Sequence, residues 1–484
     1  MATIGTAFNI TTGALDADQA ALDIVANNTA NVNTPGYTLE TPTWEENDSA
    51  SLDGLQFGMG VQETGAQSQR DRVLEQAMQQ QTQTESSSSA RLTALDQMQA
   101  MFSGATSAGT DTSAASGIGS DLSNFFDSLS SLEASPADDA LRQNVLSAAG
   151  TLASDFNGAA AQLEGQRQSL DEQSTSVAGQ ANTLLEDIAQ LNVQIESSSP
   201  NADAGTLEDQ RQQDLTNLSQ LMGNRTVPTE NNGLTVTTMG GALLVSEGQA
   251  YQLTTGEDGG VTHFFDGEGT DITSDLTSGG GELGGMLTVR DQDIPQVENS
   301  LDALAYAVGS SVNAQNEAGW NQNGAAGAAI FSLPANATTA NPAGSAAQIA
   351  VVMTDPTGIA AAGTVPGSTP PAGEGSSDNA NVTAMASLEN AGIVNGISPT
   401  SYFSDMVTSL GSLTSEVSSE NTAQQAALTQ LQSQIGSVSG VNLNDEAADL
   451  ETLEQSYQAA SKLFTVLDEV MVSALNLGVE TTYS

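Results

Sequence analysis

Both ends of this chain carry the spacing of a helix with a single apolar seam. Between Ile4 and Val32 the seam positions alternate by four and three residues, which is the a/d spacing of a helix that packs against a partner helix. Asp18 is the one clear departure from the pattern. A second run of the same kind extends from Leu450 to Ala474. Nothing nearby in the sequence covers either seam, so we expect the two helices to pair with each other, with copies of themselves, or with both.

The seam residues are our candidates for an assembly interface. They are Ile4, Phe8, Leu15, Leu22, Val25 and Val32 near the N-terminus, and Leu450, Leu453, Tyr457, Phe464, Leu467 and Met471 near the C-terminus. A helix with one uncovered face frays in water, so we expect both ends to be frayed or disordered until partners cover them.

Turn-forming residues bound each terminal helix. In NNTANVNTPGY, residues 27–37, Asn tolerates left-handed backbone, and Pro followed by Gly does not continue a helix. The segment SGVN, residues 439–442, is a similar break, and the acidic pair after it suits a helix N-terminus. The predicted hinge or linker residues are Asn31, Asn33, Pro35, Gly36 and Tyr37 at the first break, and Gly440 and Asn442 at the second.

The middle of the chain is mostly helical in pattern. Leu163, Leu170, Val177, Leu184 and Leu191 follow one another at intervals of seven, and residues 207–222, 301–312 and 403–431 carry further helical spacing. Residues 225–272 alternate short β-prone runs with turn clusters, which predicts antiparallel hairpins. The order of these patterns predicts a mostly α-helical, elongated, multi-domain rod with one β-rich module and with both termini at one pole.

These patterns also divide the chain. We expect a coiled-coil-like terminal helical domain from residues 1–50 with 437–484, a helical rod domain from 51–222 with 284–320 and 399–436, a β-hairpin module at 223–283, and a loop-rich variable insertion at 321–398, where Ala, Gly, Thr and Pro show little periodicity.

The charge balance excludes several classes of partner. The chain has 9 Lys and Arg against 59 Asp and Glu, a formal net charge of −50. A nucleic acid or an anionic membrane surface requires a basic face, which this composition does not supply. Such an acid excess is also what a surface adapted to a salty medium carries, because salt screens the repulsion between carboxylates. We therefore form the hypothesis of a salt-adapted surface.

Other features bear on location. The chain has no Cys, which excludes disulfides and thiol chemistry. No apolar run approaches the roughly 20 residues of a membrane span. The first basic residue is Arg70, so the cationic start of a secretory signal is absent, and we expect either a cytoplasmic protein or export by another route.

No catalytic or metal-binding constellation emerges from the sequence. His263 is the one histidine and stands among β-prone residues without partners for catalysis. DGEGTD, residues 266–271, lacks the glycine and the closing glutamate of a calcium loop. SGGGELGG, residues 278–285, lacks the Lys of a phosphate-binding loop. In RDQD, residues 290–293, the carboxylates suit a helix start. We predict a structural protein with no cofactor and no enzymatic activity.

The two ends resemble a known family. ANNTANVNTPGYT, residues 26–38, after an amphipathic helix, resembles the N-terminal motif of bacterial flagellar axial proteins, the rod, hook and hook-associated subunits. GVNLNDEAADLETLEQSYQAASKLF, the start of a motif that runs over residues 440–477, resembles their C-terminal motif. Residues 206–223 and 280–324 are similar to segments of the hook-associated members. Residues 321–398 show no clear match.

The resemblance implies a structural subunit that self-assembles helically through its terminal helices at the junction between hook and filament. It implies contacts with hook protein, with an adjoining hook-associated or junction protein and with the filament. It further implies export as an unfolded chain through the flagellar type III apparatus, with a cytoplasmic chaperone on the C-terminal helix, and a final place in the extracellular flagellum.

Two alternatives remain at this point. The first is another axial subunit, although hook protein would be richer in β structure and flagellin lacks the NTPGY element. The second, from a different class, is an acidic, salt-adapted secreted enzyme or adhesin with coiled-coil ends. An enzyme should carry a pocket with converging polar groups, which the sequence does not indicate.

Overall fold

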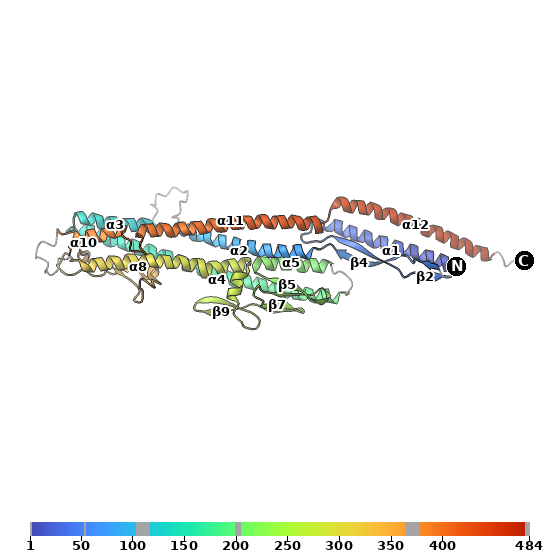
Figure 1. Ribbon diagram of the computed structural model, residues 1–484, viewed down its shortest axis with the longest axis horizontal. Helices are drawn as coiled ribbons and strands as arrows, with labels where there is room; N and C mark the ends of the chain where they lie inside the picture. Colours follow the sequence, from blue (N-terminus) through green and yellow to red (C-terminus); the bar gives the residue numbers. More distant parts are fainter. Residues whose placement is uncertain (1, 53–54, 103–116, 199–204, 364–376, 480–484) are drawn as a thin grey trace.

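The computed structural model describes residues 2–52, 55–102, 117–198, 205–363 and 377–479. The elements lie along one long axis, and both ends of the chain are at the same end of the molecule (Figure 1). The prediction of a mostly helical chain with small antiparallel sheets is confirmed.

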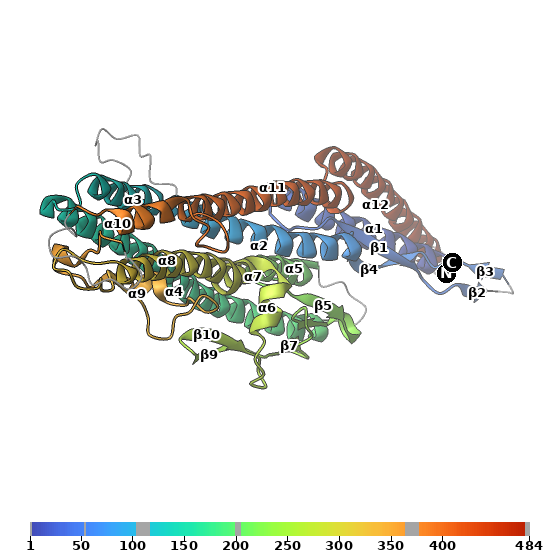
Figure 2. The ribbon, with the colours of Figure 1, turned by 60° about the vertical axis from the view of Figure 1, so that its left-hand side comes forward.

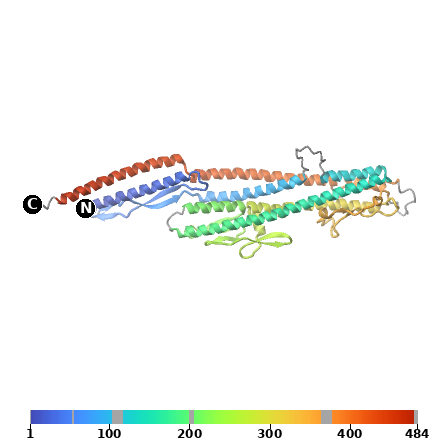
Figure 3. The same ribbon diagram turned by 180° about the vertical axis from the view of Figure 1, so that it is seen from behind.

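The terminal helices lie side by side at that end. α1 (Ala2–Asn31) and α12 (Leu443–Val479) run antiparallel to each other and are in contact along their lengths (Figures 1 and 3). The rings of Phe8 and Phe464 meet edge to face, with centroids 4.7 Å apart. One face of each helix is thus covered by the other within a single chain.

A β-arm packs on a different face of α1. β1 (Glu40–Glu46) pairs antiparallel with β4 (Val61–Ser68), and the shorter pair β2 (Ala50–Leu52) and β3 (Leu55–Phe57) extends the arm. A Cβ at Gly13 would lie 2.9 Å from the carbonyl oxygen of Val61, so a glycine lets the strand cross α1 closely. The boundary expected at residue 50 falls inside this arm, because residues 40–46 find their strand partners at 61–68.

α1, α12 and the β-arm together make up the terminal unit. Long helices form the rod next to it. They are α2 (Arg72–Phe102), α3 (Ile118–Ala134), α4 (Asp139–Ser197), α5 (Gly205–Leu221), α8 (Ile294–Ala318) and α11 (Pro399–Ser439). α11 lies along α2, and α4 packs against α3 and α5 (Figure 2). The continuous core between them is mainly Leu, Ile, Val and Ala, with several Met and Phe side chains, among them Phe125, Phe126 and Phe156. Helix-on-helix seams of mainly aliphatic side chains therefore hold the rod.

Short elements connect the rod helices. α6 (Thr273–Gly279) and α7 (Gly281–Thr288) lead through a π-turn at Val289–Asp293 into α8. Single 3-10 turns lie at Glu230–Asn232, Pro356–Gly358 and Ser387–Asn390.

The β-prone segment forms the predicted antiparallel hairpins on one side of the rod. β5 (Arg225–Pro228), β6 (Leu234–Thr237), β7 (Leu243–Ser246) and β8 (Gln249–Ala250) make a four-stranded meander, and β9 (Thr254–Asp258) pairs with β10 (Val261–Phe265). Gly259 and Gly260 turn the second hairpin with φ of +62° and +82°, values that favour glycine.

The segment expected as a loop-rich insertion lies at the end of the molecule away from the termini (Figures 1 and 3). It holds β11 (Phe331–Ser332), α9 (Ser345–Gln348), β12 (Ala350–Val351) and α10 (Ala380–Ala386) between loops. Single apolar side chains such as Ile330, Ile349 and Met385 are fully buried in the rod core. Isolated anchors of this kind leave no periodic signal in a sequence, so their packing was not predicted.

Candidate assembly surface on the terminal helices

The predicted seam residues lie on α1 and α12, except Val32, which directly follows α1, and the rings of Phe8 and Phe464 meet between the two helices. Val25 is buried, and the other seam residues of α1 are half-buried. On α12, Leu453, Phe464 and Leu467 are half-buried, while Leu450, Tyr457 and Met471 remain 38–40% exposed. The structure therefore brings the two seams together within the chain, and a layer of only two helices and an arm leaves much of their apolar surface in water.

A second group of apolar side chains on α12 is about half exposed. Leu463, Val466, Val470, Val472 and Leu475 are 47–61% exposed. α12 carries nine of the seventeen large hydrophobic side chains that are exposed in the described part of the chain. This group was not predicted from the sequence, because its residues alternate along the helix with those of the covered seam. An uncovered apolar concentration of this size is typical of an interaction surface.

Asn28 is the centre of the joint between α1, the β-arm and α12. Its Nδ2 donates to the Glu40 carbonyl oxygen at 2.8 Å and to Glu446 Oε2 at 3.2 Å. Its Oδ1 accepts from the Tyr37 hydroxyl at 2.8 Å and from the Glu40 backbone N–H at 3.1 Å. The side chain is 1% exposed, so all four hydrogen-bonding positions of a buried amide are used. Sequence reasoning missed this residue, although Ala21, Val25 and Asn28 share one buried face of α1.

Burial shifts the ionisation of the groups around Asn28. Desolvation, together with the charges of Asp449 and Asp445, raises the pKa of Glu446, and the hydrogen bond from Asn28 opposes this rise. Desolvation and nearby carboxylates also raise the pKa of the Tyr37 hydroxyl, so Tyr37 remains a hydrogen-bond donor to Asn28.

A second polar cluster ties the terminal unit to the rod. Asp209 of α5 accepts from the Thr38 backbone N–H at 3.1 Å and from the Thr38 hydroxyl at 2.7 Å. Arg70 binds the same carboxylate at 2.5 Å and donates to the Gly205 carbonyl oxygen at 2.9 Å. The Arg70 side chain is 8% exposed, and Glu208 and Glu75 lie 3.6 Å and 3.8 Å from its guanidinium nitrogens. The first basic residue of the chain thus serves as a buried link between the domains.

The predicted hinge residues lie around these two clusters. Asn31 donates to the Asn27 carbonyl oxygen, whereas Asn33, Pro35 and Gly36 are exposed, Gly36 with φ of +81°. At the second break the Asn442 side chain caps α12 by accepting from the Asn444 backbone N–H at 3.1 Å. Gly440 follows Ser439, whose carbonyl oxygen accepts from the Leu39 backbone N–H at 2.9 Å. The two breaks therefore meet in space at one joint.

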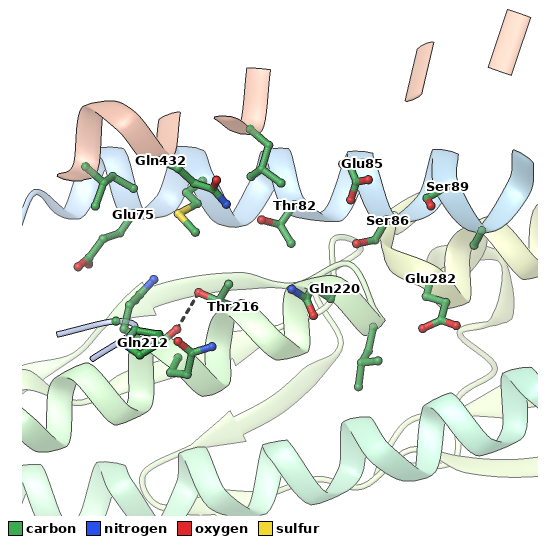
Figure 4. Close-up of a pocket in the computed structure, with 18 of the residues that line it drawn as sticks. Glu75, Thr82, Glu85, Ser86, Ser89, Gln212, Thr216, Gln220, Glu282 and Gln432 are labelled. Atoms are coloured by element: carbon green, nitrogen blue, oxygen red, sulfur yellow. Dashed lines mark hydrogen bonds between the residues drawn. The ribbon is translucent and has the colours of Figure 1, made fainter. Parts of the chain in front are cut away.

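A groove of about 840 Å³ runs from this joint along the rod between α2 and α5. Figure 4 shows Glu75, Thr82, Ser86 and Ser89 on α2 facing Gln212, Thr216 and Gln220 on α5, with Glu282 nearby. The described residues that line the groove include no His, Lys or Arg. Hydroxyl, amide and carboxylate groups of this kind can bind a hydrogen-bonding segment, and they supply no histidine or thiolate for nucleophilic catalysis.

The other residues singled out in the sequence have structural partners. His263 Nδ1 lies 2.7 Å from Asp271 Oδ2 on the surface of the β-module. Arg290 is 1% exposed and binds Asp171, Asp291 and the Thr262 carbonyl oxygen. Among the residues that the structure describes, no three His, Asp or Glu side chains are grouped as a metal site would need. The helices of the same described ranges include none long and apolar enough to span a bilayer.

Comparisons with known proteins connect this geometry to a family. A model of the flagellar hook-associated protein FlgK helical domain matches residues 110–331, and a model of flagella basal body rod proteins matches residues 8–38. Flagellar hook-associated protein 1 of Escherichia coli (strain K12) is 26% identical, with 96% of this chain and 98% of that protein covered. The same protein of Bacillus subtilis (strain 168) is 25% identical, with 96% of each chain covered. The chain is therefore similar to flagellar hook-associated protein 1 over nearly its full length.

A solved structure agrees with this assignment at the level of the fold. The flagellar hook junction protein FlgK from Burkholderia pseudomallei aligns with a TM-score of 0.65 and 20% sequence identity, over 75% of this chain and 100% of that one. The predicted resemblance to hook-associated protein 1 is confirmed, because relatives of that name match over 96% of this chain. The prediction of a structural flagellar protein, and not an enzyme, is likewise confirmed, because these relatives are flagellar hook-associated proteins.

Proposed function

We propose that this chain is a member of the hook-associated protein 1 family and a structural subunit at the junction between hook and filament. Copies of the chain assemble around a common axis through α1 and α12, which form a coiled-coil-like terminal domain. The observation that carries the proposal is the uncovered apolar surface of α12, where Leu463, Val466 and Val470 are 47–53% exposed in a chain with a net charge of −50. Apolar side chains gathered on one element of an otherwise acidic surface are typical of a site that a partner covers.

The energetics support assembly by many subunits together. Full burial of one Val- or Leu-sized side chain stabilises a contact by about 1.5–3 kcal/mol. The uncovered residues of α12 and the half-exposed seam of α1 supply several such contacts per copy. Each copy also loses conformational freedom when its ends become ordered, so one pair of chains gains little, whereas a closed ring of copies gains on both sides of every subunit.

The expected partners follow from the same surface. The terminal unit meets its own copies, and along the axis it meets hook protein on one side and an adjoining hook-associated protein and the filament on the other. Before export through the flagellar type III apparatus, a chaperone covers α12, since its exposed Leu and Val side chains would otherwise associate inside the cell. The mature protein is then extracellular, in the flagellum. The seam residues form the inner helix pair, and the Asn28 joint sets the direction of the rod relative to that pair.

Deletion of the gene in the source bacterium tests the proposal. We expect non-motile cells whose hooks carry no filaments in electron micrographs, and we expect the full chain to restore both. A chain that ends at residue 442, and so lacks α12, should not restore them, although its rod should remain folded by circular dichroism. Normal filaments on the deletion strain would refute the proposed function.

A further inference from the structure

The uncovered side chains of α12 include a second helical seam. Ala459, Leu463, Val466 and Val470 are separated by four, three and four residues, the same spacing as the covered seam. At 100° per residue, Leu463 and Val466 lie about 100° and 160° around the helix from Phe464, which faces α1. Leu463 and Val466 are 52% and 53% exposed. α12 can therefore pack against a further helix without releasing α1.

Lys462 lies at the edge of this second seam and is the one lysine of the chain. The residues three and four positions away in its helix, Gln458, Ala459, Thr465 and Val466, include no acid. The side chain is exposed, and none of the ion pairs among the described residues involves it. The sequence segments of the terminal unit, residues 1–69 and 440–484, contain 17 Asp and Glu and no other Lys or Arg. An ion pair in which a terminal unit supplies the cation must therefore use Lys462.

The outward face of α1 has the complementary character. Asp16 and Asp23 are exposed and stand seven residues apart, so they share one face of the helix. The exposed residues on the same face between and before them are small or polar, namely Asn9, Thr12 and Gln19. α12 and the β-arm pack on other faces of α1, so this acidic face is free for another molecule. A face of short side chains lets an aliphatic seam approach closely, and its carboxylates attract one lysine.

We propose that the second seam of α12 docks on the outward face of α1 in a second copy of the chain, with Lys462 paired to Asp16 or Asp23 of that copy. The inference rests on the proposed function, and it specifies which surfaces of neighbouring copies touch. The two surfaces are different patches of one molecule, so the contact is heterologous, and it repeats around a ring or along a helix instead of closing after two copies. The choice of a copy as the occupant follows from this complementarity between α12 and α1 of the same sequence.

Lys462 mainly fixes the position along the two helices at which α12 of one copy meets α1 of the next. An exposed ion pair adds little affinity, whereas a misplaced contact between two acidic terminal units sets like charges against each other. The apolar seam supplies affinity, and the single cation selects the position at which seam and acidic face meet.

A charge swap in the full-length chain tests the contact by sedimentation velocity at moderate ionic strength. Lys462→Glu should weaken self-association about tenfold or more, while Lys462→Arg should keep it near the wild-type value. Combining Lys462→Glu with Asp16→Lys or with Asp23→Lys should restore association in one of the two double variants. Arg225→Glu, on exposed β5 away from the terminal unit, is the matched control and should change nothing.

The outcomes separate this inference from the function on which it rests. Wild-type association that is unaffected by Lys462→Glu, or that neither double variant restores, overturns the proposed contact and leaves the proposed function standing. A triple change of Leu463, Val466 and Val470 to Ser should abolish association while circular dichroism remains unchanged, and its failure to do so also overturns the contact. A wild-type chain that does not associate at any concentration overturns the proposed contact, and the deletion strain then decides the proposed function separately.

Discussion

Asn28 holds three separate pieces of chain together through one buried amide. Replacing it by Ala leaves the Tyr37 hydroxyl, the Glu40 backbone groups and the Glu446 carboxylate without their partner in a buried place. We expect Asn28→Ala to destabilise the joint by about 2–3 kcal/mol, because unsatisfied buried polar groups are costly. Amide hydrogen exchange in α1 and β1 should become faster by a corresponding factor.

Asn33→Ala is the matched control in the same turn. Asn33 is exposed, and we expect its replacement to leave the exchange rates close to those of the wild type. Equal effects of the two substitutions would mean that turn propensity, and not the buried hydrogen bonds, holds the joint.

These two asparagines also show what can and cannot be predicted from the sequence for single residues. NNTANVNTPGY correctly predicts where α1 ends, because Pro35 and Gly36 stop any helix. It does not distinguish Asn28 from Asn33, since both have the same intrinsic turn preference. Only the position of Glu446, 418 residues further along the chain, makes one of them the centre of the joint.

Asp121 and Asp155 form a second residue-scale feature, between α3 and α4. Asp121 is 5% exposed, and its Oδ2 finds no donor among the described residues. The hydrogen bond with Asp121, with burial and the Asp121 charge, raises the pKa of Asp155 from 3.8 to about 6. Protonated Asp155 is thus favoured in the folded state. Its contribution to the free energy of unfolding is complete below pH 3.8 and is lost as the pH rises through about 6.

Asp155→Asn should therefore stabilise the chain at pH 7.5. Asp155 is half-buried, so after screening by solvent we expect a gain of only about 1 kcal/mol, and none near pH 4. Urea unfolding at the two pH values measures the difference. Asp127→Asn, an exposed position on α3, is the control and should show no such pH dependence. A gain in stability of equal size at both pH values would contradict the interpretation that protonated Asp155 forms a hydrogen bond with Asp121.

At the scale of elements, the glycine-rich segment 278–285 acts in packing. α7 approaches α2 so closely that a Cβ at Gly285 would lie 2.3 Å from the Ser87 carbonyl oxygen. We expect Gly285→Ala to destabilise the rod by about 1–3 kcal/mol, because the two backbones must separate. Gly436→Ala in α11 is the matched control, since nothing lies within 4 Å of its Cβ position. There the change should stabilise the helix by about 0.5–1 kcal/mol.

Thermal unfolding followed by circular dichroism compares the two glycine variants. Shifts of the same sign would show that helix propensity alone governs both sites, and the close approach of α7 to α2 would then carry no energetic weight.

The sequence predicts elements well where one face alternates regularly. In α4, Leu163, Leu170, Val177 and Leu191 are buried as the seven-residue pattern predicts, and only Leu184 is partly buried, beside the fully buried Leu185. A straight helix drifts by about 20° per heptad, so a strict seven-residue pattern does not follow the centre of one buried face at every step. The β-arm was missed because ETPTWEE has little β propensity and is stabilised by Val61–Ser68 and by α1.

At the scale of the whole molecule, several of the few cations are used inside the protein. Arg142 and Arg290 are each 1% exposed, and Arg70 and Arg211 are also buried. Arg142 donates to the Pro136 and Ile359 carbonyl oxygens, so it neutralises no surface carboxylate. The exposed surface therefore keeps few cations among its many carboxylates, and repulsion between these carboxylates opposes the compact state.

Salt should consequently stabilise this chain. The Debye length falls from about 10 Å at 0.1 M to about 3 Å at 1 M, which removes most repulsion between exposed carboxylates and much less of the attraction inside buried arginine pairs. We expect the midpoint of thermal unfolding to rise by several degrees over this range of NaCl, most steeply below about 0.3 M. A variant with Glu451, Glu454 and Glu469 of α12 changed to Gln carries three fewer exposed charges and should depend less on salt. A midpoint that falls with added NaCl would mean that ion pairs, and not apolar seams, hold the molecule together.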